Sequence, residues 1–77
     1  MSALSAVTAK VVIRVLQRFG FVIARQAGSH VRLRHLADPT RNVTVPYHGR
    51  DITKKTLLSI LRQAKIGVEE FKHMLRQ

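Results

Sequence analysis

Hydrophobic and polar residues alternate with two different periods along this chain, and the change of period divides it into elements. From residue 8 to residue 19, "TAKVVIRVLQRF", apolar residues recur every three or four positions, which is typical of a helix with one buried face. Thr8 is a suitable N-terminal cap and Gly20 a suitable stop. Residues 53–65 have the same period and predict a second helix, and residues 68–75 predict a short third one.

Between the first two helices the period falls to two, which is the period of a half-buried strand. Residues 21–26 and 30–35 therefore predict two strands, and residues 42–46 predict a third. Ala27 and Gly28 separate the first two strands. They favour a tight turn, because glycine tolerates a positive φ.

A two-residue loop at this turn would set the register of the hairpin. It would place Arg25 opposite His30 and Ala24 opposite Val31, and paired residues share a face of the sheet. One face would then carry apolar side chains for the core, namely Val22, Ala24, Val31 and Leu33. The other face would carry a basic cluster with two apolar neighbours, namely Arg25, His30, Arg32 and Arg34 with Phe21 and Ile23. A bulged turn would shift this register by one residue on one strand.

The predicted order of elements is α-β-β-β-α-α. A three-stranded meander covered by helices keeps one face free, so we predict an α+β protein. The pattern is similar to the double-stranded-RNA-binding fold, α-β-β-β-α, with a short extra C-terminal helix. The chain of 77 residues is long enough for one small domain. We expect residues 1–7 to be a flexible lead-in and residues 8–77 to form that single domain.

The net charge of the chain limits the kinds of partner that it is expected to bind. Fourteen Lys and Arg stand against four Asp and Glu, and the formal net charge is +10. Solubility needs only about 2–8 net charges on a small domain, so this excess favours binding to a polyanion such as RNA. No cysteine is present, which argues against disulfides and zinc. No segment resembles a membrane span or a secretory signal, so we expect a cytoplasmic protein without a membrane partner.

Histidine is the one residue type in this sequence suited to proton transfer near neutral pH. The acidic residues form no carboxylate pair, and the four histidines lack metal-ligand spacing, so we expect neither a metal site nor a cofactor. His73 lies four residues after Glu69 and is expected to pair with it on a helix. His30 and His35 are five residues apart and should face opposite sides of one strand.

His30 among arginines is compatible with two functions. RNA carries its own nucleophile, the 2′-hydroxyl group, so cleavage needs a proton-transfer group and cations that stabilise the transition state. His30 with Arg25, Arg32 and Arg34 would supply both. A non-catalytic double-stranded-RNA-binding module would fit the fold and charge equally well, and the residues alone leave both functions open.

Three motifs in order resemble the HicA toxins of HicA–HicB toxin–antitoxin modules. They are "GSH" after a strand that follows "FGF", then "VTVPYHGRDI", then "TLLSILRQAKIGVEEF". The resemblance implies a metal-independent endoribonuclease that cleaves mRNA and is inhibited by a HicB-type antitoxin. It identifies His30 as the catalytic histidine, with Gly28 and Ser29 of the motif intact. The chain departs from the family at Val31, where members often have His or an aromatic residue, and at Lys65, where many have Gly.

On this hypothesis several residues would contact RNA. Arg25, Arg32 and Arg34 would hold phosphate beside Gly28 and Ser29. Lys54 and Lys55 would add phosphate contacts, because a helix N-terminus attracts anions. An antitoxin with an acidic surface would cover the same face and use the same charges.

Overall fold

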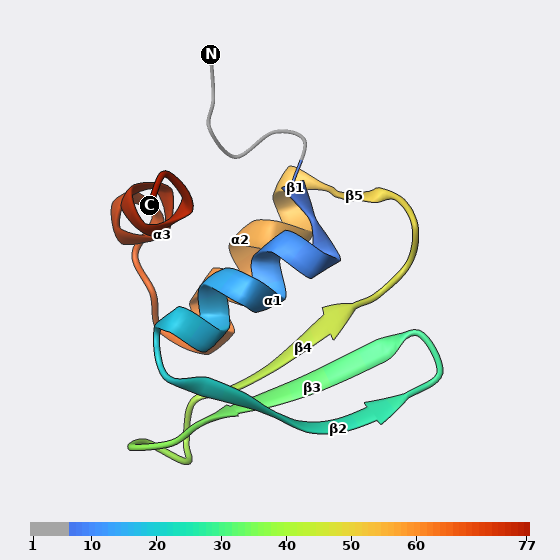
Figure 1. Ribbon diagram of the computed structural model, residues 1–77, viewed down its shortest axis with the longest axis horizontal. Coiled ribbons are helices and arrows are strands. Elements are labelled where there is room, and N and C mark those ends of the chain that lie inside the picture. The colour runs from blue at the N-terminus through green and yellow to red at the C-terminus, as the bar shows by residue number, and fades with distance from the viewer. Residues whose placement is uncertain (1–6) are drawn as a thin grey trace.

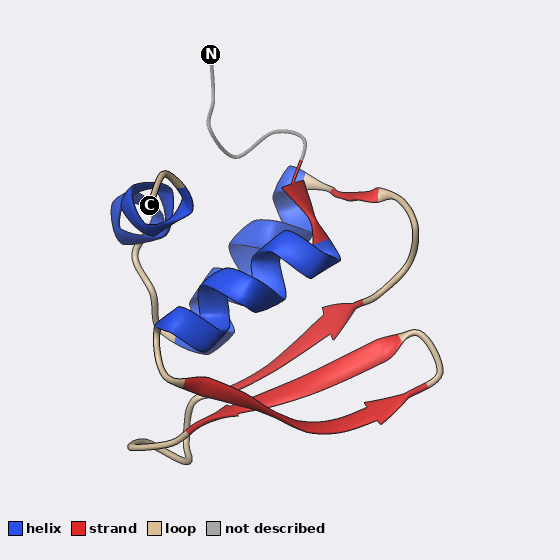
Figure 2. Ribbon diagram, in the orientation of Figure 1, coloured by secondary structure: helices blue, strands red, loops and turns tan. Residues whose placement is uncertain are grey.

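Helices and strands form two layers in this protein (Figures 1 and 2). The computed structural model describes residues 7–77, so residues 1–6 of the expected lead-in lie outside the described residues. The elements in chain order are β1 (Val7–Thr8), α1 (Ala9–Arg18), β2 (Phe21–Ala27), β3 (His30–His35), β4 (Asn42–Pro46), β5 (Asp51–Ile52), α2 (Lys54–Ala64) and α3 (Val68–Leu75).

The main sheet is an antiparallel meander with the strand order β2-β3-β4. The helices lie on one side of this sheet, and its other face is open (Figure 2). This arrangement confirms the predicted α+β fold with an additional C-terminal helix. The longest described helix, α2, has 11 residues, and no helix within residues 7–77 is long and apolar enough to cross a bilayer.

Local capping explains where each helix begins. The hydroxyl of Thr8 accepts a hydrogen bond from the backbone N–H of Val11 at 3.3 Å, which confirms the predicted cap of α1. Thr53 does the same for α2, accepting from the N–H of Thr56 at 3.1 Å. At the start of α3, the carboxylate of Glu70 accepts from the N–H of Gly67 at 2.9 Å.

A second, two-stranded sheet was not predicted. β1 and β5 are two residues long each, and Val7 pairs with Ile52 in antiparallel fashion. Two residues are too few to show a period in the sequence. Both apolar side chains are buried, so this pairing joins the start of the described chain to the segment before α2.

The register of the β2–β3 hairpin differs from the prediction by two residues next to the turn and by one residue beyond a bulge. Ala24 forms a bulge between Ile23 and Arg25, and the turn is Gly28-Ser29 instead of Ala27-Gly28. Arg25 therefore pairs with Arg32, and it is Ala27 that pairs with His30. A bulge places two residues of one strand opposite one of the other, so the faces change over along β2.

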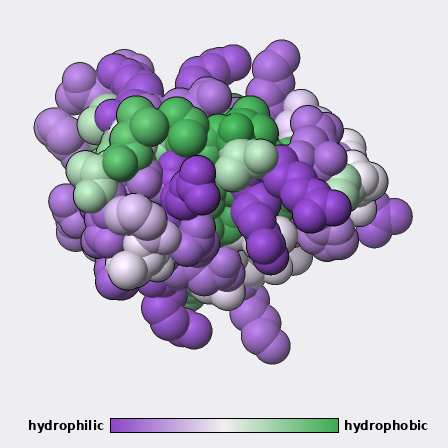
Figure 3. Space-filling model, turned by 90° about the horizontal axis from the view of Figure 1, so that it is seen from below, coloured by the Kyte–Doolittle hydropathy of each residue, from purple (hydrophilic) through white to green (hydrophobic). Residues whose placement is uncertain are grey.

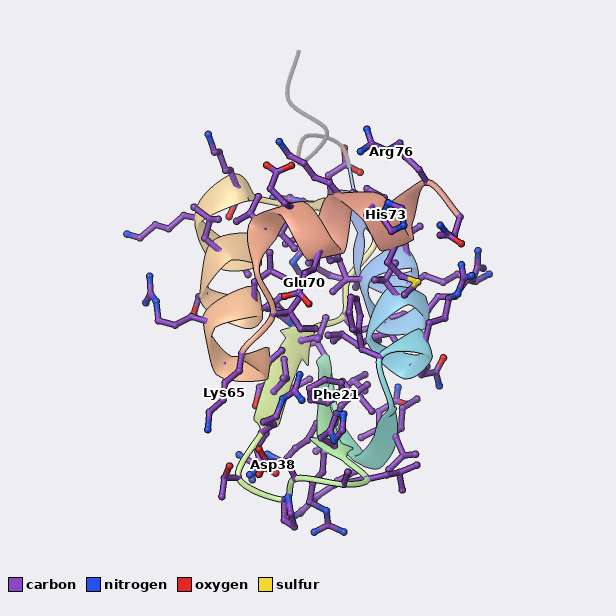
Figure 4. The ribbon with its side chains drawn as sticks, turned by 90° about the vertical axis from the view of Figure 1, so that its left-hand side faces the viewer. Phe21, Asp38, Lys65, Glu70, His73 and Arg76 are labelled. Carbon is purple, nitrogen blue, oxygen red and sulfur yellow. The ribbon has the colours of Figure 1, made fainter. Side chains whose placement is uncertain are left out.

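The observed register corrects four predicted positions on β2 and leaves two on β3 intact. Phe21, expected on the free face, is only 1% exposed and points into the interior (Figure 4). Val22 and Ala24, expected in the core, are both exposed. Val31 and Leu33 are buried, which confirms their predicted side of β3. The reason is packing, because the core gains more from burying a phenylalanine than from burying a valine or an alanine.

Ile23 was also expected on the free face, but it pairs with the buried Leu33 and thus lies on the helix-covered face. It remains 47% exposed there. The core itself lies between the sheet and the helices. Its largest fully buried side chains are Phe21, Phe71, Leu16, Leu33, Leu57, Ile60 and Leu61. Phe71 fastens α3 to this core, since it is the buried residue of that helix.

Candidate active site

The open face of the main sheet brings His30 together with two arginines. Along β3 the side chains alternate, so that His30, Arg32 and Arg34 are exposed on this face. Arg32 is paired with Arg25 on one side and with Thr44 on the other. A hollow of about 280 Å³ results, which we call the histidine hollow, lined by Arg25, Ala27, His30, Arg32 and Thr44.

The turn before His30 depends on Gly28. Its φ is +57°, a left-handed conformation that side chains with a Cβ disfavour. No atom lies within 4 Å of where a Cβ would stand, so the backbone conformation and not space is what requires glycine here. The carbonyl of Ser29 accepts a hydrogen bond from the backbone N–H of Tyr47, which fastens the turn to the end of β4.

The chemistry of the hollow is that of one imidazole among cations. Within residues 7–77, His30 makes no side-chain hydrogen bond, and the residue is exposed. Arg25 and Arg32 are paired across the two strands, and no described acidic residue lines the hollow. Two guanidinium groups beside a proton acceptor form a site suited to an anion that must lose a proton nearby.

The other sequence-derived candidates lie farther away. Arg34 shares the open face but flanks Val22 and Asn42 and does not line the histidine hollow. Lys54 and Lys55 lie in the first turn of α2, which begins beside β5 in the helical layer (Figure 1). The structure thus joins His30, Arg25 and Arg32, and it does not bring the two lysines to them.

Thr44 and Ala27 are lining residues that the sequence reasoning missed. A signal for Thr44 was present, because the alternation in "NVTVP" sets it opposite to the buried Val43 and Val45. Its backbone N–H donates a hydrogen bond to the side-chain carbonyl of Gln63 at 3.2 Å. Ala27 had no such signal, since it was assigned to the turn.

His73, His48 and Glu69 have partners away from the histidine hollow. His73 contacts Gln77 at 3.2 Å, so its expected pairing with Glu69 is wrong, and Glu69 instead forms an ion pair with Lys72 at 3.6 Å (Figure 4 labels His73). His48 accepts a hydrogen bond from a backbone N–H at 3.3 Å. Across residues 7–77 no three His, Cys, Asp or Glu residues gather in a way that could hold a metal ion.

Comparison with models of known protein families shows which family the chain belongs to. Residues 9–66 match the family model described as the HicA toxin of bacterial toxin-antitoxin systems, which is about three quarters of the sequence. The chain belongs to the HicA toxin family. A search of curated proteins finds no match. The matched segment begins at the first residue of α1 and ends just after α2, so it contains the whole hairpin with His30, whereas α3 lies beyond it.

Membership in this family shows the general role of the protein. It is the toxin component of a toxin–antitoxin pair, and its family implies a cognate antitoxin as its protein partner. The basic open face agrees with such a role, because Figure 3 shows hydrophilic residues over much of this face, on both sides of a hydrophobic band.

Proposed function

We propose that this HicA toxin is a metal-independent endoribonuclease that cleaves mRNA with His30 as its catalytic histidine. We further propose that a HicB-type antitoxin blocks it by covering the open face. The observation that carries the proposal is the histidine hollow, in which an exposed imidazole lies beside Arg25 and Arg32. An mRNA substrate would place this activity in the cytoplasm.

The reaction follows from the chemistry of RNA. His30 accepts the proton of the 2′-hydroxyl group, and the 2′-oxygen attacks the adjacent phosphorus. The bond from phosphorus to the 5′-oxygen breaks, and the leaving 5′-oxygen takes a proton from water. The products are a 2′,3′-cyclic phosphate and a 5′-hydroxyl end, and His30 returns its proton to solvent. Since the attacking and leaving oxygens lie on opposite sides of phosphorus, one histidine serves the attacking side and the open hollow admits water to the other.

The arginines have an electrostatic role in this scheme. Negative charge on the phosphate oxygens increases toward the transition state, and Arg25 and Arg32 are positioned to stabilise it. The backbone of Gly28 and Ser29 sets where His30 begins β3, so these two residues position the histidine and pass close to the RNA. Arg34, Lys54 and Lys55 would act on the RNA at longer range as a general attraction for phosphate.

Metal independence is supported by the lining of the histidine hollow, which includes none of the four carboxylates of the chain. Asp38 accepts hydrogen bonds from the hydroxyl and the N–H of Thr40, at 2.6 and 3.1 Å, and these contacts lower the pKa of Asp38. Glu69 and Glu70 are engaged on α3. Proton transfer by histidine and charge stabilisation by arginine need no further group, because RNA supplies the nucleophile.

The test is the substitution His30→Ala in the full chain, with His73→Ala as the matched control on α3. We expect the cleavage rate of mRNA to fall by about 10²–10⁴-fold for His30→Ala, with RNA affinity within about two-fold, and no change for His73→Ala. Cleavage should persist in a chelator and fail on RNA with a 2′-deoxy sugar at the cleaved position. Addition of the antitoxin should stop cleavage.

Two outcomes would contradict the proposal. Cleavage by His30→Ala at the normal rate would remove His30 from the chemistry. RNA binding without cleavage by the unmodified toxin would favour the alternative, a non-catalytic double-stranded-RNA-binding module, which the same fold and charge support.

A further inference from the structure

A second hollow lies on the helix side of the β2–β3 hairpin, behind the histidine hollow. It measures about 380 Å³, and we call it the tyrosine groove. Its lining comes from α1, from the hairpin and from the residue after β4: Lys10, Ile13, Arg14, Gln17, Ile23, Gln26, Val31 and Tyr47. Since Val31 follows His30 on β3 and faces the other way, the two hollows lie on opposite sides of the same strand.

The lining of the tyrosine groove has the chemistry that recognises a nucleobase. Ile13 and Val31, both buried, form an apolar floor, and Tyr47 is the sole tyrosine of the chain and 41% exposed. An aromatic face stacks on bases of any sequence, and side-chain amides such as those of Gln17 and Gln26 can hydrogen-bond to base edges.

The cations of the groove point to a phosphate-bearing ligand. Lys10 and Arg14 lie one helical turn apart on α1, and no acidic residue lines the groove among the described residues. Lys10 and Tyr47 also line an adjoining hollow with Thr8, His48 and Gly49, so the basic and aromatic surface continues past the tyrosine. A groove of this volume suits one ring system, whereas a protein partner would need a surface of roughly 800 Å² on each side.

Tyr47 is joined directly to the turn that carries His30. Its backbone N–H donates to the carbonyl of Ser29, and the preceding residue, Pro46, pairs with His30 across the sheet. An RNA strand that leaves the histidine hollow around this end of the sheet therefore meets Tyr47 next.

We propose that the tyrosine groove binds an unstacked nucleobase of single-stranded RNA next to the cleaved phosphate. Tyr47 stacks on the base, and Lys10 and Arg14 hold the neighbouring phosphates. This inference rests on the proposed ribonuclease function and adds to it that the substrate is single-stranded where it is cut, because a base inside a duplex cannot enter the groove.

The experiment measures RNA binding in a His30→Ala background, so that no cleavage occurs. The probes are a short single-stranded RNA with 2-aminopurine at successive positions and the same RNA annealed to its complement. For Tyr47→Ala we expect single-strand affinity to fall by about 5- to 150-fold and the fluorescence quenching of 2-aminopurine to disappear. Tyr47→Phe keeps the stacking face and should bind like the parent, and duplex affinity should stay the same in all three proteins.

Several results would overturn the proposal. These are unchanged single-strand affinity in Tyr47→Ala, an equal loss in Tyr47→Phe, or no binding of single-stranded RNA by the parent. If Tyr47→Ala weakened binding to the antitoxin but not binding to RNA, the groove would be a protein-docking surface instead. Thermal unfolding of each variant excludes misfolding as the cause. If His30→Ala still cleaves, the same probe with a 2′-deoxy sugar at the cleaved position stays intact, so that a failure of the His30 assignment and a failure of the groove are distinguishable.

Discussion

His30 and His35 lie at the two ends of β3, and their surroundings are opposite in character. His30 is exposed on the open face, without a described hydrogen-bond partner for its ring. The Nε2 atom of His35 lies 2.8 Å from the carbonyl of Phe19, and its Nδ1 atom accepts from the N–H groups of Ala37 and Asp38 at 3.1 and 3.2 Å. The ring of His35 also meets Phe21 edge to face, with centroids 5.0 Å apart.

These contacts make His35 a structural histidine, whereas the ring of His30 has no such contacts with the described residues and is free to meet a ligand. Because Nδ1 of His35 receives two N–H donors, it must accept, and Nε2 then carries the proton that it donates to Phe19. A proton arriving at Nδ1 would break two backbone hydrogen bonds. His35 thus joins the end of α1 to the loop after β3, whereas a proton on His30 disturbs no contact within the described chain.

The position of Gly20 shows how closely this end of β3 is packed. Its φ is +99°, and a Cβ there would stand 2.9 Å from Nε2 of His35. The glycine that ends α1 is therefore required twice, for its backbone conformation and for the ring beside it. The turn that precedes His30 also needs a glycine, Gly28, but only for its conformation.

The largest expected effect on stability comes from replacing His35. We expect His35→Ala to lower the free energy of unfolding by roughly 2–3 kcal/mol, since it removes three hydrogen bonds and the contact with Phe21. His30→Ala should change it by no more than about 0.5 kcal/mol. Urea unfolding of both variants measures this difference. Equal losses would show that the two histidines are not divided in this way.

The next largest effects are expected at the arginines around His30. Arg25→Gln and Arg32→Gln should each lower kcat/KM for RNA by about 10-fold, because both line the histidine hollow. Arg34→Gln, outside the hollow, should mainly reduce the salt dependence of RNA binding. The check is kcat/KM and affinity across a range of salt concentrations. If all three substitutions act alike, the arginines contribute only a general field.

The smallest expected effect on stability concerns Lys65, which ends α2 beside the loop after β3. Lys65 has φ +59°, the one positive value at a non-glycine residue within the described chain, and its ammonium group donates to the hydroxyl of Thr40 at 3.3 Å. We expect Lys65→Gly to raise the free energy of unfolding by about 0.5–1 kcal/mol, because a left-handed residue with a Cβ is strained.

Lys65→Ala is the matched control for that substitution. It removes the contact with Thr40 but keeps the strain, so it should bring no gain in the same unfolding measurement. A loss of stability in Lys65→Gly would mean that the contact with the loop outweighs the strain. The His35 end of the strand would then depend on α2 as well as on α1.

Much of this architecture was predictable because it depends on neighbours in the chain. The apolar period located the main helices and strands to within one or two residues, and Thr8 could be named as a cap from its side chain and position alone. Alternation along β3 correctly separated His30 and Arg32 from Val31 and Leu33. The grouping of Arg25 with His30 on one face was also predicted, although the register next to the turn was wrong by two residues, a shift that keeps each residue on its face.

The sequence by itself thus determined the class of fold, the basic charge and the face on which His30 lies. The tertiary structure alone decided that Phe21 is buried through a bulge at Ala24, that Thr44 completes the histidine hollow and that Tyr47 meets Ser29. The physical reason is the range of the interactions. Periodicity and capping act between residues a few positions apart, whereas a register depends on the packing of distant segments, and a slip of one residue exchanges the two faces of a strand.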